Sequence, residues 1–261
     1  FHNNPKDMRG SRTIKERIFL AEKTDQIYFV SKWVKDKFFE GLPYSHRNNC
    51  EILYPAIKPL KKFPSKQNLI IFTGKLNSSK GYDIFGKAII KILEKYKNWK
   101  AIAIGNEPRE KFDFSHKNFK ILDWIQHDRI LKYYSKASIS IVPSKWLEPF
   151  GRTAMESAAH GCATITSKNG GLPETFYNTL FLSKTTSEEI YKLINLLIKN
   201  KNIRKFLQKK NFSNVKHKLE NKVKKIDDLK RFFLNSKFNY NSGVKLKILH
   251  ISQFDERNNY R

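Results

Sequence analysis

Residues 138–161, SISIVPSKWLEPFGRTAMESAAHG, decide the fold of this chain. An apolar run typical of a strand, 138–143, leads through a polar loop into helix-compatible residues that Gly161 stops. The loop brings Glu148 to the start of the helix, and Glu156 on the second turn points back toward the same place. The first helical amides lack intrahelical partners and carry the positive end of the helix dipole, which suits a diphosphate. These amides belong to Gly151, Arg152 and Thr153.

A second segment, residues 70–89, IIFTGKLNSSKGYDIFGKAI, predicts the same order of strand, turn and helix. The strand covers 69–73, Gly74 makes the turn, and Ser78 or Ser79 caps the helix. The ammonium groups of Lys75 and Lys80 lie at this junction, where they would neutralise a diphosphate and stabilise it as a leaving group. The alternative is that these lysines are surface residues and that Glu148 and Glu156 are solvated acids near a helix start.

Both segments resemble those of a known enzyme family. Residues 148–174, EPFGRTAMESAAHGCATITSKNGGLPE, resemble the E-x7-E signature of retaining GT-B glycosyltransferases, the group 1 or family 4-like type. Residues 74–81 resemble that family's G-R-L-x-x-x-K-G pattern, except that Lys75 replaces an arginine and so loses its planar fork. The resemblance implies an α/β fold of GT-B type, in which a Rossmann-like donor domain with a parallel sheet accompanies a partial second Rossmann-like domain.

The resemblance also implies roles for single residues. It places Glu148 by the donor sugar, Glu156 on the nucleotide ribose, and the loop 123–125 near the base. Trp124 is either a neighbour of that base or a core aromatic residue. His2 resembles a histidine that faces the donor sugar, although a lone histidine near a chain start is as often simply exposed. The predicted catalytic residues are Glu148, Lys80, Lys75 and His2. The predicted donor-binding residues are Glu156, Gly74, Gly105, Trp124, Ile125, Phe150, Gly151, Arg152, Thr153 and Gly171.

The resemblance implies transfer of a sugar from a nucleoside diphosphate sugar to an acceptor hydroxyl, with retention and without a metal or a permanently bound cofactor. The sequence contains no Asp-x-Asp, the carboxylate pair through which a metal-dependent transferase holds a diphosphate. The acceptor is expected to be a saccharide or a lipid-linked molecule in polysaccharide or lipopolysaccharide synthesis. A phosphorylase, an epimerase or a non-catalytic nucleotide-sugar-binding module would share this fold.

The segmentation predicts three regions. Residues 1–57 are the end of an acceptor-side domain, 58–241 the donor domain with its C-terminal helices, and 242–261 the start of a further domain, or a disordered or added edge strand. The resemblance implies that the last of the C-terminal helices packs back on the first domain. We expect a chain with so little acceptor domain to bind donor but turn over little. Predicted strands are 26–30, 99–105, 119–122 and 244–253, and predicted helices are 13–22, 32–39, 128–136, 187–198, 201–210 and 215–235.

The charge is extreme, because 51 Lys and Arg against 24 Asp and Glu give a net charge of +27. We attribute it to a lysine-rich composition combined with contact with an anionic membrane surface, on the inner face of the cell membrane. Nucleic-acid binding is the rival reading and is not expected, because only the charge supports it. No run reaches the length of a spanning helix, and Cys50 and Cys162 lack metal-ligand spacing, which favours the reducing cytoplasm. Cys162 is predicted to be buried.

Overall fold

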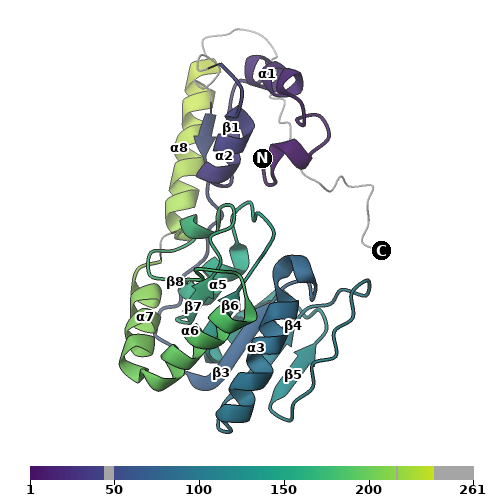
Figure 1. The fold of residues 1–261 in the computed structure, drawn as a ribbon. Coiled ribbons are helices and arrows are strands. Elements are labelled where there is room, and N and C mark those ends of the chain that lie inside the picture. Colours follow the sequence, from purple (N-terminus) through teal and green to yellow (C-terminus); the bar gives the residue numbers. More distant parts are fainter. Residues whose placement is uncertain (44–49, 216, 238–261) are drawn as a thin grey trace. The chain divides into compact units, whose positions relative to one another are not determined.

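The structure is a computed structural model that describes residues 1–43, 50–215 and 217–237 (Figure 1). The chain divides into two compact units. The first unit joins Phe1–Lys58 to the chain from His217 onward, and the second is Pro59–Lys216. The predicted strand 244–253 and the predicted third region, 242–261, lie outside the described residues.

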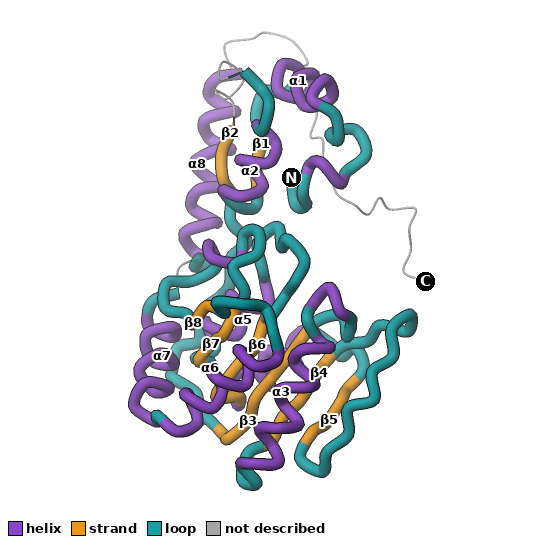
Figure 2. Tube along the Cα trace, in the orientation of Figure 1, coloured by secondary structure: helices purple, strands orange, loops and turns teal. Residues whose placement is uncertain are grey.

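The second unit is built on a six-stranded sheet in the order β5-β4-β3-β6-β7-β8, and all its neighbouring strands are parallel. In Figure 2 these strands lie side by side among the helices of the unit. The strands are β3 (Gln67–Thr73), β4 (Lys100–Ile104), β5 (Phe119–Leu122), β6 (Ala137–Val142), β7 (Ala163–Thr166) and β8 (Leu180–Phe181). The helices are α3 (Tyr82–Lys95), α4 (His127–Lys136), α5 (Arg152–Ala159), α6 (Ser187–Lys199) and α7 (Lys201–Ser213). Chain order and parallel pairing thus confirm the predicted α/β class.

Alternation along β3 explains why both faces of this sheet are covered. Ile70 and Phe72 pack in one cluster with apolar residues of α3 and α6, whereas Ile71 packs in another cluster with α4. Successive side chains of a strand point to opposite faces, so a strand with helices on both sides reads as one continuous apolar run. The central strand β6 is buried along its whole length for the same reason.

The first unit contains the parallel pair β1 (Ile27–Phe29) and β2 (Cys50–Ile52), with Ile27 opposite Cys50. Phe1 extends this pairing, because its backbone bonds Tyr28 O and its carbonyl accepts from Val30 N at 3.1 Å. The helices of the unit are α1 (Ile14–Lys23), α2 (Lys32–Phe39) and α8 (Leu219–Lys237), and a 3₁₀ turn covers Pro5–Asp7.

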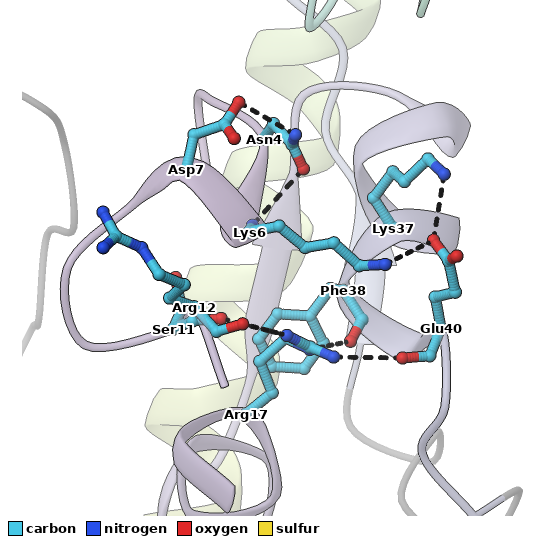
Figure 3. Close-up of polar contacts among 9 residues, drawn as sticks. All are labelled: Asn4, Lys6, Asp7, Ser11, Arg12, Arg17, Lys37, Phe38 and Glu40. Carbon is cyan, nitrogen blue, oxygen red and sulfur yellow. Dashed lines mark hydrogen bonds and ion pairs between the residues drawn. The ribbon is translucent and has the colours of Figure 1, made fainter. Parts of the chain in front are cut away.

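A buried arginine holds the irregular parts of this unit (Figure 3). Arg17 on α1 is only 2% exposed. Its guanidinium donates to four backbone carbonyls, at 2.7 Å to Phe38, 3.3 Å to Ser11, 2.8 Å to Arg12 and 3.0 Å to Glu40. Desolvation lowers its pKa, yet the carbonyls satisfy its donors. One side chain therefore ties the loop before α1 to the C-terminal end of α2.

Helix α8 groups with the first unit, which differs from the predicted boundary of 58–241 for the donor domain. Its Lys225 pairs with Glu51 at 2.8 Å and donates to Ile52 O at 3.1 Å. Just before the helix, His217 O accepts from Ile57 N at 3.0 Å. The boundary of 58–241 followed chain continuity, whereas these long-range contacts attach residues 217–237 to β2, as the resemblance implied for the last helix.

The predicted helix cap at Ser78 or Ser79 is wrong. Asn77 instead caps a 3₁₀ turn, η3 (Ser78–Lys80), through its side chain, which accepts from Lys80 N at 3.0 Å. Helix α3 starts only after Gly81, which adopts φ 75°. The serines are therefore inside the turn that precedes the helix. Among the described residues, no helix combines the length and the apolar character needed to cross a bilayer.

Candidate functional site

The carboxyl ends of β3 and β4 meet at two glycines whose backbones almost touch. A Cβ at Gly105, where φ is 144°, would stand 1.9 Å from Gly74 O, so no side chain fits there. At Gly74, where φ is 138°, nothing lies within 4 Å of an added Cβ. The space above β3 is therefore open, and a ligand can approach its backbone closely.

The loop after β6 brings Glu148, the first of the two predicted glutamates, to Lys80. Lys80 Nζ on η3 lies 2.6 Å from Glu148 Oε1, and the two side chains are 30% and 14% exposed. The backbone of Glu148 is itself fixed, because its carbonyl accepts from Gly171 N at 2.7 Å. A Cβ at Gly170 would clash with that carbonyl at 2.2 Å. The predicted residues Lys80, Glu148 and Gly171 are thus neighbours in the structure, whereas they are far apart in sequence.

Helix α5 begins beside this pair, as predicted from the sequence. Gly151 is its N-cap, with φ 108°, and as a glycine it offers no side chain to cap the helix amides. Its first amides are thus left without a capping side chain, which leaves the helix start open to an anion. Phe150 is 3% exposed, so a ligand could meet only its backbone. Thr153 is half-buried.

Glu156 is buried within the second turn of α5, with 7% of its side chain exposed. Its Oε1 atom accepts from His127 Nε2 at 3.0 Å and from Arg152 NH2 at 3.2 Å. An ionised carboxylate only accepts, so Nε2 of His127 carries the proton of that bond. Behind it, Tyr134 is fully buried and bonds Thr73 Oγ1 at the end of β3. Burial raises the pKa of Tyr134, and the Glu156 charge raises it further, so this phenol stays neutral.

Lys80 pairs with Glu148, whereas Lys75 interacts electrostatically with a different carboxylate, that of Glu107. The expectation that both ammonium groups reach one diphosphate stays a prediction. Lys75 is exposed, and its charge contributes to lowering the pKa of Glu107. The main cause is Arg109, whose Nε donates to Glu107 at 2.7 Å and brings that pKa to about 2. The loop after β4 therefore supplies a carboxylate and a guanidinium beside Lys75, which the sequence did not predict.

The exposure of Trp124, in the loop after β5, excludes one of its two interpretations, and the place beside the base stays a prediction. Its side chain is 57% exposed, so it is not a core residue. The neighbouring Asp123 accepts from Trp124 N at 2.6 Å and from Asn106 Nδ2 at 3.3 Å, which fixes the loop against the end of β4. Ile125 packs against the apolar cluster under the sheet. Trp124 is thus the side chain of this loop that is available for stacking.

The remaining predicted catalytic residue belongs to the other unit. His2 follows Phe1, the residue that pairs with β1, and its side chain is exposed. Residues 1 and 2 are not assigned to a strand, although Phe1 bonds the chain at β1. The role implied for His2 stays a prediction.

Sequence reasoning missed His127 and the pair Glu107 and Arg109. His127 is the first residue of α4 and is separated from the loop 123–125 by Gln126 alone. Glu107 comes two residues after Gly105. The signal that could have identified His127 and the Glu107–Arg109 pair is their place in the loops that follow the carboxyl ends of β5 and β4, where ligands of parallel sheets bind.

Comparison with known proteins identifies the family. Glycosyl transferases group 1 matches residues 55–213, which is more than half of the chain. The chain belongs to this glycosyltransferase family. Its matched region contains Lys75, Lys80, Glu148 and Glu156, and it extends into α7.

Curated relatives of this glycosyltransferase match it in part. An uncharacterised 42.6 kDa protein in the cps region of Klebsiella pneumoniae is 28% identical over 164 residues, 59% of this chain and 41% of the relative. An uncharacterised glycosyltransferase of Methanocaldococcus jannaschii is 31% identical over 115 residues, 41% of this chain and 29% of the relative. The chain thus spans less than half the length of these relatives.

Solved structures show the same fold. HepE of Anabaena, crystallised with UDP and glucose, matches with a TM-score of 0.71 and 14% identity, over 88% of this chain and 70% of HepE. At this identity the likeness concerns the fold. It assigns the glycosyltransferase to the α/β architecture of GT-B enzymes.

Proposed function

We propose that this glycosyltransferase binds a nucleoside diphosphate sugar and transfers the sugar, with retention of configuration, to an acceptor hydroxyl. The observation that carries the proposal is the Lys80–Glu148 ion pair of 2.6 Å beside the uncapped start of α5. The ammonium group of Lys80 and the free helix amides both favour an anion, and a diphosphate is such an anion. The UDP bound to HepE, a protein of like fold, supports a nucleotide donor.

Binding of the donor would exchange partners at Lys80. As the diphosphate takes the ammonium, Glu148 loses its cation and becomes free to accept hydrogen bonds from the donor sugar. Lys80 then stabilises the charge that grows on the leaving nucleoside diphosphate, which requires no protein-bound metal. The leaving diphosphate accepts the proton of the acceptor hydroxyl as the bond to the sugar loosens.

The remaining donor contacts follow from position. Glu156 would accept from the ribose, and the exposed Trp124 would lie by the base. Lys75, Gly74, Gly105, Gly151 and Gly171 would line the diphosphate and the sugar. His2 would contribute from the acceptor side. We further propose a saccharide or lipid-linked acceptor in polysaccharide synthesis at an anionic membrane surface, in keeping with the cps region of the Klebsiella relative and the charge of +27.

Isothermal calorimetry with UDP, GDP, ADP and CDP tests the proposal. We expect the chain to bind one of them, and Lys80→Ala to weaken that binding about tenfold, the effect of roughly 1.4 kcal/mol from one charge-assisted contact. Lys117→Ala is the control, because Lys117 is exposed and precedes β5 at the opposite edge of the sheet. DNA binding at low salt in a chain that binds none of the nucleotides would contradict the proposal.

A further inference from the structure

Glu156 accepts hydrogen bonds from two residues, Arg152 and His127, which would behave differently once a ligand is bound. Both donate to the same oxygen, Oε1. Within the described part of the chain, Oε2 accepts from no residue. The carboxylate is therefore held on one side and open on the other, and the open oxygen is the one that can accept from a hydroxyl.

Arg152 is the donor that a diphosphate would compete for. Its side chain is 67% exposed, and it stands at the first position of α5, where the anion is proposed to bind. A guanidinium matches phosphate as well as carboxylate. Arg152 can therefore leave Glu156 for the ligand without losing a partner.

His127 is the donor that would stay. It comes from a different helix, α4, so its bond to Glu156 joins two elements of the unit. Other charged or titratable groups around this carboxylate are Arg152, Tyr134 and His160. Tyr134 is engaged by Thr73, and His160 Nδ1 by the Glu156 backbone carbonyl at 2.8 Å. If Arg152 turns to the ligand, His127 alone, among the residues that the structure describes, still holds the Glu156 carboxylate.

We propose that His127 is a positioning residue for nucleotide recognition: it holds Oε1 of Glu156 so that Oε2 accepts from the ribose hydroxyls of the donor. This inference rests on the proposed donor site and assigns to it a residue of α4. A carboxylate that is not held would lose part of the binding free energy to its own ordering. The loss of His127 should thus appear as lost preference for ribose.

The test compares the ribonucleotide that binds most tightly among UDP, GDP, ADP and CDP with its 2′,3′-dideoxy counterpart. Calorimetry is run on the wild type, His127→Ala, His127→Gln and Glu156→Ala. We expect the wild type to prefer the ribonucleotide at least tenfold and both alanine variants to reduce that preference to threefold or less. His127→Gln keeps an N–H donor and should retain the preference. His116→Ala is the matched control, because His116 precedes β5 at the opposite edge of the sheet.

The outcomes separate the two proposals. If no nucleotide binds the wild type, the donor site itself is rejected and this inference with it. If a nucleotide binds and Glu156→Ala lowers the ribose preference but His127→Ala does not, only the role of His127 is overturned. An equal loss of affinity for both nucleotides in His127→Ala and His127→Gln would also overturn it, since that pattern reports a structural role alone.

Discussion

One set of loop contacts in each unit shows two different ways of holding a loop. In the first unit, the buried guanidinium of Arg17 donates hydrogen bonds to backbone carbonyls of two separate segments. In the second unit, backbone meets backbone, as where Gly105 approaches Gly74 and where Gly171 N donates to Glu148 O. The second arrangement leaves the nearby charged side chains, Lys80 and Glu148, available for a ligand.

This difference teaches where each unit is vulnerable. A loop held by one side chain depends on that side chain alone, whereas a loop held by close backbone approach depends on having no side chain at a given position. Substitutions in the two units should therefore fail for different reasons, and the following experiments test this in order of expected effect.

Removing the guanidinium should have the largest effect. Arg17→Met would leave several carbonyls unsatisfied around Ser11 and Phe38, both of which are fully buried. We expect a loss of about 3 kcal/mol in the free energy of unfolding of the first unit. Urea unfolding and hydrogen exchange at residues 11–12 and 38–40 would measure it. Arg9→Met is the control, since Arg9 is exposed, and a loss as small as that of this control would refute the comparison.

The glycine contact should come next. Gly105→Ala must move the carbonyl of Gly74 and adopt a positive φ, at a cost of about 2 kcal/mol or more. Gly10→Ala separates the cost of the positive φ from the cost of the steric clash, because Gly10 has φ 83° but open space around an added Cβ. We expect Gly10→Ala to show only the strain of about 1 kcal/mol. Equal losses of unfolding free energy in both variants would mean that close approach adds nothing.

A helix cap should matter less than either. Thr13 caps α1 in a reciprocal arrangement, in which Thr13 Oγ1 accepts from Glu16 N at 3.2 Å and the Glu16 carboxylate accepts from Thr13 N at 2.8 Å. Thr13→Ala is expected to cost about 1 kcal/mol in thermal or urea unfolding, and Thr13→Ser should restore most of it. Failure of the serine variant to recover stability would assign the effect to packing rather than to capping.

The pH dependence should give the smallest effect. His160 is 3% exposed, and desolvation lowers its pKa from the usual 6.5. The unfolded chain therefore takes up a proton more readily than the folded one, so His160 favours folding above pH 6.5 and destabilises progressively below it. Thermal unfolding between pH 5 and 8 should show a shallower acid loss in His160→Gln than in the wild type. Identical profiles would remove this role of His160.

The sequence predicted the strongly patterned elements well. Helix α2 and strand β5 start and end where periodicity placed them, and Cys162 is buried as expected. The start of α3 was missed because a 3₁₀ turn capped by Asn77 comes first, and α3 begins only after Gly81. Local pattern also could not show that Arg109 would neutralise Glu107 or that α8 would attach to β2. Glu107 and Arg109 are sequence neighbours whose pairing depends on the conformation of their loop, whereas Lys225 and Glu51 are brought together only by the finished fold.

The attachment of α8 has a consequence for the order in which the protein forms during translation. The second unit is one uninterrupted stretch, Pro59–Lys216, and can fold as soon as that stretch has left the ribosome. The first unit must wait, because Glu51 and Ile52 meet Lys225 only after the whole second unit has been synthesised. Strand β2 is thus synthesised early but pairs with α8 only late. We therefore expect chaperones to bind residues 1–58 more than the second unit during synthesis.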